Sequence, residues 1–449
     1  MQIFVFAIFF LLNFNIAASG YNYSDINVQY RLRGLAYPNL DYDAGTVADG
    51  RAYYNQALSM GITGRFDPGI EITAKFKAIG MVNSSFTITD YSWQSELPYN
   101  NTDFIPFLSQ AYIKLINFNR LPVDIVIGKQ PLEYGSGMII SDNGLGLNAI
   151  RLIIRYPLLI TTELVNVKIK ENFQQGKDFD INGITTAFLL KKTNISLSFF
   201  QELDESGTVL FNEIDLNKSK LTKYINRQFY SLRLAKETKI SFYSFEYALS
   251  EGNITKSDDT KSKIHSSGWI FSGALIGERT QLGKVTAKLT IAGSSSGDLI
   301  APDDETYFNP TLRKRFDGID RTGWGELFNL NLAESAFDTT QKYFSGMGVF
   351  AVEIFFTPLY GWDLYLSNFL YSASGAFFPQ SPKTSFFEQT YLNQKYNLGA
   401  EMDMGVKFKY SKYLSFTFSF CRYTPPNFTF VWPKSQTIEM FKFDTVFSF

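Results

Sequence analysis

Apolar and polar side chains alternate strictly along many segments of about ten residues, and this alternation restricts the fold more than any other feature. Within 28–33, Val28, Tyr30 and Leu32 occupy one face, and the polar residues between them occupy the other. The same period of two recurs in 70–78, 285–291 and 402–410. Successive side chains point to opposite faces of a strand, whereas a helix repeats every 3.6 residues. The chain is therefore predicted to be all-β.

Two all-β architectures show such alternation. In a sandwich the apolar face of each strand meets a second sheet, whereas in a membrane barrel it meets lipid and the polar face lines a wet interior. The chain is 45% hydrophobic and contains 44 Phe and 26 Tyr, yet its mean hydropathy is only −0.08. Its apolar residues are therefore dispersed among polar ones, which excludes a protein that crosses a membrane with several helices.

The connections between the alternating segments decide between the two architectures. Short, turn-like connectors fall at 65–69, 119–122, 155–159, 191–194, 236–239, 278–283, 358–362 and 410–412. Long polar stretches, predicted to be loops, fall at 81–105, 202–226, 251–266, 293–345 and 372–396. Short turns at one end and long loops at the other are typical of an outer-membrane barrel, with the turns on the periplasmic side and the loops outside the cell.

The turns also predict the number of strands. If both termini lie at the short-turn end, eight short turns imply a single antiparallel barrel of about 18 strands. The predicted strands lie near 26–36, 52–64, 70–80, 107–117, 122–130, 148–156, 161–170, 181–190, 194–201, 228–235, 239–250, 267–277, 284–292, 347–357, 362–371, 397–409, 413–421 and 437–449.

Both ends of the chain carry further signals. Residues 1–19 are predicted to be a secretory signal peptide, because a short apolar run is followed by small residues, although no Lys or Arg precedes the run. The barrel is expected to occupy 20–449. At the other end, Phe441, Phe443, Phe447 and Phe449 share one face of the last strand. A terminal Phe on such a strand resembles the tail that the bacterial outer-membrane assembly machinery recognises. These signals predict the bacterial outer membrane as the location and its lipid as a partner.

Composition makes most enzyme classes improbable. The chain has 1 Cys, Cys421, and 1 His, His265, so it offers neither a cysteine- or histidine-built metal site nor much general-base chemistry. The net charge of −1 argues against a nucleic-acid partner. The acidic run 303–305 lacks the spaced ligands of a calcium loop. We expect no enzymatic activity, no cofactor and no metal.

Several segments resemble the alginate-export family of outer-membrane barrels. The matching segments are Ile127-Gly128-Lys129-Gln130, Tyr134-Gly135-Ser136-Gly137, Asn148-Ala149-Ile150-Arg151, Phe316-Asp317-Gly318, Gly325-Glu326-Leu327-Phe328 and Gly399-Ala400-Glu401-Met402-Asp403. The resemblance implies a barrel of 18 strands with a narrow cationic conduit for an anionic polysaccharide. Strict alternation from Ile127 would place Lys129 toward lipid, whereas the resemblance, or a bulge at Gly128, would turn it inward. Because a lysine at mid-depth on the lipid face costs ~2–4 kcal/mol, we expect Lys129 inside the barrel or at the membrane boundary.

The polar faces of the predicted strands carry more cations than anions, Lys168 being counted among the cations, and the compensating acids, among them Glu202 and Asp204, fall in predicted loops. A basic interior attracts anions and repels cations. The residues predicted to line the pore or contact the solute are Arg31, Arg33, Lys75, Lys77, Lys129, Arg151, Arg155, Glu401 and Asp403. Loop 293–345, which carries Arg313, Lys314, Arg315 and Arg321, is expected to occlude the outer mouth partly.

The sequence thus predicts a porin-like channel for anionic solutes, either an acidic polysaccharide or a uronate. A surface barrel that binds a ligand or adheres to a host without transporting a solute is the alternative. A lipolytic barrel that uses His265 with Ser266 is a third possibility, although such enzymes place the two residues across strands.

Overall fold

The computed structural model describes most of the barrel and part of the segments inside it. The described residues are 21–38, 51–66, 69–82, 105–142, 144–156, 159–170, 178–205, 222–256, 259–279, 283–295, 308, 310–312, 324–327, 347–358, 361–373, 396–424 and 437–449. The predicted signal peptide, Phe316–Gly318 and the four basic residues of loop 293–345 lie outside them.

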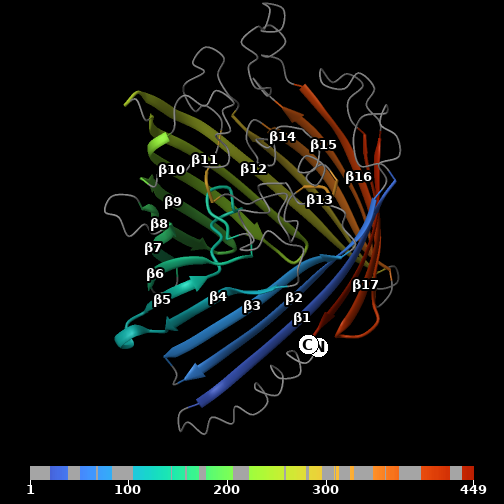
Figure 1. Ribbon diagram of the computed structural model, residues 1–449, viewed down its shortest axis with the longest axis horizontal. Coiled ribbons are helices and arrows are strands. Elements are labelled where there is room, and N and C mark those ends of the chain that lie inside the picture. Colours follow the sequence, from blue (N-terminus) through green and yellow to red (C-terminus); the bar gives the residue numbers. More distant parts are fainter. Residues whose placement is uncertain are drawn as a thin grey trace, which may run out of the picture.

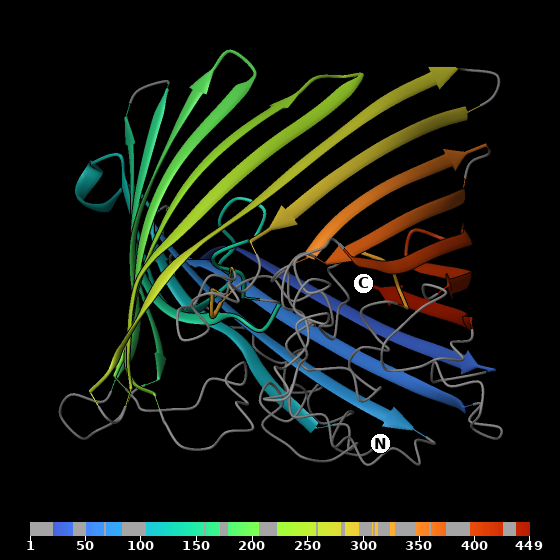
Figure 2. The same ribbon diagram turned by 90° about the horizontal axis from the view of Figure 1, so that it is seen from above.

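The described residues form one closed antiparallel sheet of 18 strands (Figure 1). The strands are β1 (Tyr21–Tyr37), β2 (Arg51–Phe66), β3 (Ile70–Val82), β4 (Ile105–Leu115), β5 (Val123–Gln130), β6 (Leu147–Tyr156), β7 (Ile160–Lys170), β8 (Phe179–Leu190), β9 (Thr193–Asp204), β10 (Thr222–Glu237), β11 (Ser241–Lys256), β12 (Lys261–Arg279), β13 (Gly283–Ser294), β14 (Met347–Thr357), β15 (Trp362–Ala373), β16 (Tyr396–Lys409), β17 (Leu414–Thr424) and β18 (Ile438–Ser448). Each strand pairs with its neighbours in sequence, and β1 also pairs with β18 and closes the barrel. Figure 2 shows this seam, where blue β1 runs beside red β18.

The predicted all-β barrel of 18 strands is confirmed, and each predicted strand overlaps an observed one. The predicted loop 251–266 is wrong, because β11 continues to Lys256 and β12 begins at Lys261. In this region Lys263 and His265 are exposed on one face while Ser262, Ile264 and Ser266 are buried on the other. The alternation of exposed and buried residues thus continues here, but the exposed residues are polar. These residues were predicted to be a loop because the sequence analysis looked for strands with an apolar face.

The outer face of the barrel is apolar. Phe441, Phe443, Phe447 and Phe449 are all exposed there, as the alternation in the last strand predicted. Near the short-turn end, aromatic pairs such as Trp362 with Phe408 line the same face, with ring centroids 4.7 Å apart. Aromatic residues concentrate at the two membrane boundaries of such barrels. Among the described residues, no helix is long and apolar enough to cross a membrane.

The interior of the barrel contains packed apolar side chains as well as polar ones. The connection between β5 and β6 turns inward, and its teal trace lies inside the barrel in Figure 1. Its residues Met138, Ile139 and Ile140 are buried in one cluster with Phe308 and Leu327, which belong to the long connection between β13 and β14. Inner-face side chains of many strands complete the cluster. Phe308 and Leu327 of loop 293–345 thus lie inside the barrel, while the expected occlusion of the outer mouth stays a prediction.

Candidate functional site: the inner wall from β1 to β7

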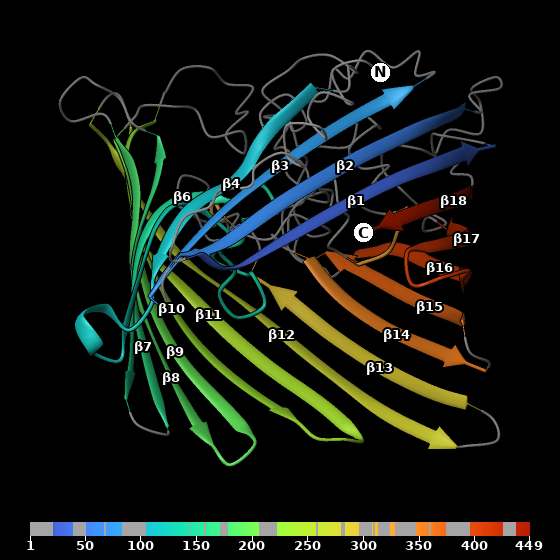
Figure 3. The same cartoon turned by 90° about the horizontal axis from the view of Figure 1, so that it is seen from below.

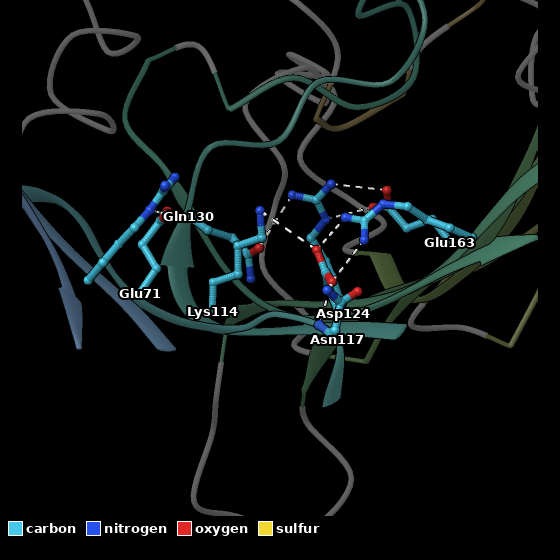
Figure 4. Close-up of polar contacts among 9 residues, drawn as sticks. Glu71, Lys114, Asn117, Asp124, Gln130 and Glu163 are labelled. Atoms are coloured by element: carbon cyan, nitrogen blue, oxygen red, sulfur yellow. Dashed lines mark hydrogen bonds and ion pairs between the residues drawn. The ribbon is translucent and has the colours of Figure 1, made fainter. Parts of the chain in front are cut away.

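Asp124 of β5 is the centre of a polar network near the short-turn end of the inner wall. Its carboxylate accepts hydrogen bonds from the Arg155 guanidinium of β6, one of 2.9 Å from Nη1 and a second from Nη2. Lys114 Nζ of β4 lies 3.7 Å from Asp124, and the backbone N–H of Asn117 donates a hydrogen bond of 3.1 Å. Figure 4 shows Lys114 and Asn117 directed toward this carboxylate. One buried acid therefore holds two cations in place.

A second network lies closer to the middle of the wall. Arg151 of β6 donates hydrogen bonds of 2.6 and 3.0 Å to the two carboxylate oxygens of Glu163 on β7. The hydroxyl of Tyr134, on the inward connection after β5, donates to the same carboxylate. Burial raises the pKa of the Tyr134 hydroxyl, and the charge of Glu163 raises it further. Tyr134 therefore stays a neutral donor that fixes the inward connection to the wall.

The anions and cations of these networks differ in exposure. The Asp124 and Glu163 side chains are 0% and 14% exposed, whereas those of Arg155 and Lys114 are 44% and 30% exposed. Arg151 is 21% exposed above Glu163. The acids therefore lie against the wall, and the cations cover them on the side of the interior. A paired network of this shape presents a positive surface even though its charges nearly balance.

Arg31, Arg33, Lys75 and Lys77 lie on the inner faces of β1 and β3, together with buried Leu35 and Thr73. Arg33 is bound bidentately by Asp444 of β18, with hydrogen bonds of 2.6 and 3.0 Å. Figure 3 shows β1 to β4 as one continuous part of the wall. The structure thus brings these four residues, Arg151 and Arg155 onto one stretch of the wall, on β1, β3 and β6.

Lys77 also lies near Asp142, a residue of the inward connection. Burial raises the pKa of the Asp142 carboxyl, while a 2.9 Å hydrogen bond from the Gly146 N–H and the charge of Lys77 act against this rise. The inward connection is therefore coupled to β3 through charge and to β7 through Tyr134.

The structure places Lys129 on the outer face of β5, so its assignment to the interior is wrong. Its direct cross-strand partner is Asn148, which is exposed, whereas Ala149 next to Asn148 is buried in the interior cluster. Directly paired residues of antiparallel strands share a face. Lys129 Nζ donates a 2.9 Å hydrogen bond to the carbonyl of Leu108. Gly128 has a φ of 122°, but it does not turn the next side chain inward.

Lys168 of β7 is likewise on the outer face, where it pairs directly with Asn148. Its Nζ lies 3.0 Å from both Asp178 and Asp180. Glu202 and Asp204, expected in a loop, instead lie on the inner face of β9 and are buried. The excess of cations inside the barrel is therefore smaller than the sequence predicted and is concentrated on the wall from β1 to β6.

Glu401 and Asp403 lie on the inner face of β16, and both are 2% exposed. The segment 324–327 covers them. Glu401 Oε1 accepts hydrogen bonds of 2.6 Å from the backbone N–H groups of Glu326 and Leu327, and Oε2 accepts one of 3.1 Å from the Tyr371 hydroxyl. Two segments that the family resemblance singled out separately are thus in direct contact.

Two further carboxylates of the wall hold inserted segments in the same way. Glu246 of β11 accepts a 2.5 Å hydrogen bond from the Ser136 N–H. Glu202 accepts a 2.7 Å hydrogen bond from the Thr311 hydroxyl and a 2.6 Å one from Arg227. Sequence reasoning missed Glu163 because it alternates with buried apolar side chains such as Val165, and it missed Glu202 because the predicted strand ended at 201, one residue before it. In the sequence, the inner face of β7 therefore resembles a face directed toward lipid.

The arrangement of His265 argues against the lipolytic alternative. His265 is exposed on the outer face of β12, with Nδ1 3.8 Å from a carboxylate oxygen of Glu251, while Ser266 is buried on the opposite face. The two side chains therefore cannot act together. Among the residues that the structure describes, no group of His, Cys, Asp and Glu could hold a metal ion.

No protein-family model matches the chain, and no curated protein sequence does. Solved structures match over nearly the whole length. OccAB2 of Acinetobacter baumannii has a TM-score of 0.53 at 8% identity, covering 96% of this chain and 99% of that one. OccD3 (OpdP) of Pseudomonas aeruginosa has a TM-score of 0.52 at 9% identity, covering 96% and 93%. OpdK of the same organism, solved with vanillate, has a TM-score of 0.52 at 11% identity, covering 95% and 98%.

These matches define a class of fold, that of the bacterial outer-membrane porins. The chain has this fold: an antiparallel barrel of 18 strands with an apolar outer face, as a barrel surrounded by lipid requires. The similarity to the alginate-export family still depends on the sequence motifs alone.

Proposed function

We propose that the chain is an outer-membrane channel for anionic solutes and performs no enzymatic chemistry. The observation that carries the proposal is the inner wall from β1 to β7, where buried acids fix partly exposed cations. Asp124 beneath Arg155 and Lys114 is the clearest case. Positive groups in a pore with low-dielectric walls raise the local concentration of anions and repel cations.

The geometry also favours passage along this wall. The apolar cluster packs against the inner faces of many strands from β6 onward and reaches Leu35 and Tyr37 at one end of β1. Arg31, Lys75 and Lys77 remain partly exposed. A solute that follows the wall would meet a series of cations, each already in contact with other groups of the protein. Such contacts are weak and numerous, which allows a solute to leave as well as enter.

The solute class follows from the chemistry of the cations. Arg151 and Arg155 present planar guanidinium groups, which suit carboxylates. Together with the resemblance to the alginate-export family, this favours a uronate or an acidic polysaccharide. Each guanidinium already binds an acidic side chain of the wall. A carboxylate of the solute would therefore contact only the exposed edge of the guanidinium.

The test is a reversal-potential measurement in planar bilayers under a potassium chloride gradient. The wild type should favour chloride, and joint replacement of Arg31, Arg33 and Arg151 by Glu should shift the preference toward potassium. A matched triple variant with Gln separates loss of positive charge from gain of negative charge, and it should give an intermediate value. Cation preference in the wild type, or no shift in the Glu variant, would overturn the proposed selectivity.

The interior cluster supports one alternative, a barrel that binds a ligand at its surface and transports nothing. Met138, Ile140, Phe308 and Leu327 pack together inside the barrel and leave less room for a passage. The same bilayers distinguish the two functions, because a sealed barrel gives no conductance steps at any voltage.

A further inference from the structure

The outer face of the barrel changes from apolar to polar along one row of side chains on β7 to β12. The row consists of directly paired residues, one on each strand, and we call it the polar row: Asn166, Asn182, Gln201, Gln228, Glu251 and His265. Figure 3 shows these strands side by side on one side of the barrel. The row lies on the outer face, because sequence neighbours of its members, such as Val165, Phe200 and Ile264, are buried on the inner face.

The neighbouring row toward the short turns is apolar and aromatic. Its members are again direct partners on adjacent strands: Leu164, Ile184, Phe199, Tyr230 and Leu249. The ring centroids of Phe199 and Tyr230 are 5.3 Å apart, and the Tyr230 hydroxyl donates a 2.9 Å hydrogen bond to Gln228 of the polar row. Aromatic side chains with a polar tip are typical of the boundary between lipid tails and headgroups. The polar row therefore lies where the headgroups begin.

The part of the outer face without amide or charged side chains is short on this side of the barrel. It extends from Ile160 to Leu164 on β7 and from Ile184 to Leu190 on β8. A tilted strand needs about 9–11 residues to cross the apolar layer of a membrane. On β14, by contrast, apolar residues occupy the outer face all the way from Gly348 to Phe356. Because a bilayer thins locally beside a short apolar stretch, headgroups on the β7 side should lie against the polar row.

Carboxamides dominate the polar row and extend into the row beyond it. Asn166 Nδ2 donates a 2.8 Å hydrogen bond to Asn182 Oδ1, and Gln201 Nε2 donates a 3.2 Å one to Asn226 Oδ1 in the next row. A carboxamide has two donor hydrogens and an oxygen that can accept twice, so one such bond uses only part of its capacity. Hydroxyl groups also both donate and accept. The row is therefore suited to a ligand that carries several hydroxyl groups.

Two basic side chains beside the row lie next to acids. Lys168 Nζ lies 3.0 Å from both Asp178 and Asp180, and His265 Nδ1 lies 3.8 Å from a carboxylate oxygen of Glu251. A phosphate would have to compete with these carboxylates, whereas the hydroxyl groups of a sugar bind carboxamides without a net charge. The row thus suits the sugar headgroup of a lipid better than a phosphate.

We propose that the polar row is a binding surface for the sugar headgroup of a membrane glycolipid. The acyl chains pack against the apolar and aromatic row, and the hydroxyl groups of the sugar exchange hydrogen bonds with the carboxamides from Asn166 to Gln228. The surface continues the apolar outer face of the barrel, so a lipid that already lies beside the barrel can occupy it. The proposal rests on the membrane location in the proposed function, but it does not depend on the passage of anions.

Native mass spectrometry of the full-length barrel tests this surface. The barrel is extracted from vesicles that contain equal amounts of digalactosyl diacylglycerol, phosphatidylglycerol and phosphatidylethanolamine with the same acyl chains, and the bound lipids are identified. The wild type should retain the galactolipid in preference to both phospholipids. The triple variant Asn166→Leu, Asn182→Leu and Gln201→Leu should retain about tenfold less galactolipid, as expected for the loss of several weak hydrogen bonds.

Asn368→Leu is the matched control, because Asn368 is exposed on the outer face of β15, outside the polar row, and should behave like the wild type. If the triple variant fails to fold, Gln201→Leu with Gln228→Leu leaves the bond between Asn166 and Asn182 in place and should still lower retention severalfold. Equal retention of all the lipids by the wild type, or unchanged galactolipid in a folded row variant, would overturn the proposal.

Light scattering in detergent tests a different occupant of the row, a second copy of the chain. A wild-type dimer that becomes a monomer in the triple variant would overturn the glycolipid site. Conductance is measured separately in bilayers without glycolipid. A sealed barrel that still prefers the galactolipid refutes the channel and supports the site, whereas anion-selective current without that preference supports the channel and refutes the site.

Discussion

Arg33 and Asp444 are joined by two hydrogen bonds across the seam of the barrel, although 411 positions separate them in the chain. Arg33 lies on β1 and Asp444 on β18, as direct partners in the register that closes the sheet. Both side chains are about one-tenth exposed, at 9% and 10%. The ion pair therefore links the first strand of the barrel to the last and fixes their register.

Breaking this pair should weaken closure of the barrel. Asp444→Ala leaves the guanidinium buried without a partner, and we expect a loss of about 3–5 kcal/mol in the free energy of unfolding. The exchange variant Arg33→Asp with Asp444→Arg should recover most of that loss. Urea unfolding in micelles, followed by tryptophan fluorescence, measures both. A single variant as stable as the wild type would show that the seam does not depend on the pair.

The last residue contributes to the same seam through its backbone. Phe449 exchanges two backbone hydrogen bonds with Val28, of 2.8 and 2.9 Å, while the residue as a whole is 67% exposed. We expect deletion of Phe449 to lower the amount of protein in the outer membrane of cells severalfold, with a smaller effect on unfolding of barrel that has already assembled. Phe449→Ala retains both backbone bonds and separates the role of the ring. Normal outer-membrane levels of the deletion variant would refute its role as an assembly signal.

Asp124 offers a test of the inner wall that does not change the cations themselves. In Asp124→Asn the amide oxygen can still accept from the Asn117 N–H, but Arg155 and Lys114 lose their counter-charge. We expect a larger preference for chloride in reversal potential and a loss of about 1–3 kcal/mol in stability. The control, Asp363→Asn, frees Lys409 on the other side of the barrel. If the reversal potential shifted equally in both variants, the ions would not pass preferentially along the wall from β1 to β7.

The inward connection after β5 depends on Gly135. Its φ is 63°, and a Cβ at this position would collide with the carboxylate of Glu246, the group that accepts from the Ser136 N–H. We expect Gly135→Ala to displace the connection and raise single-channel conductance, because the left-handed backbone and the lost hydrogen bond both destabilise its inward position. Gly273→Ala, which has only ordinary contacts, should leave conductance unchanged. Unchanged conductance in Gly135→Ala would mean that the connection does not limit the passage.

The strands could be predicted because the membrane imposes a simple pattern on them. Ile70 and Ile72 face lipid while Glu71 and Thr73 face inward, and any chain that crosses as a strand shows this period. The prediction of strand faces failed where the outer face is not apolar or where the inner face is. Lys263 and His265 continue β12 with a polar outer face, and Val165 and Val167 line an inner face that is apolar. The polarity of an inner face depends on which segments pack against it. The period of two contains no information about those segments.

The candidate site was predicted in part for the same reason. Arg31, Lys75 and Arg151 follow from alternation, whereas Glu163 lies among apolar residues and Glu202 lies one residue beyond the predicted strand, so both escape it. The contact of Glu401 with Glu326 joins residues 75 positions apart, and nothing in local sequence predicts it. Lys129 was misplaced because a resemblance of motif was preferred to strict alternation, and the alternation was correct.

The packed interior also sets how the barrel should respond to temperature. Phe200, Phe229 and Phe308 are fully buried inside it, so unfolding exposes an apolar core to water, as it does in a water-soluble domain. A calorimetric scan should therefore show a substantial increase in heat capacity on unfolding. Cooling weakens hydrophobic contacts but leaves the hydrogen bonds between strands largely intact. In the cold, the inserted segments should loosen from the wall while the barrel around them stays closed.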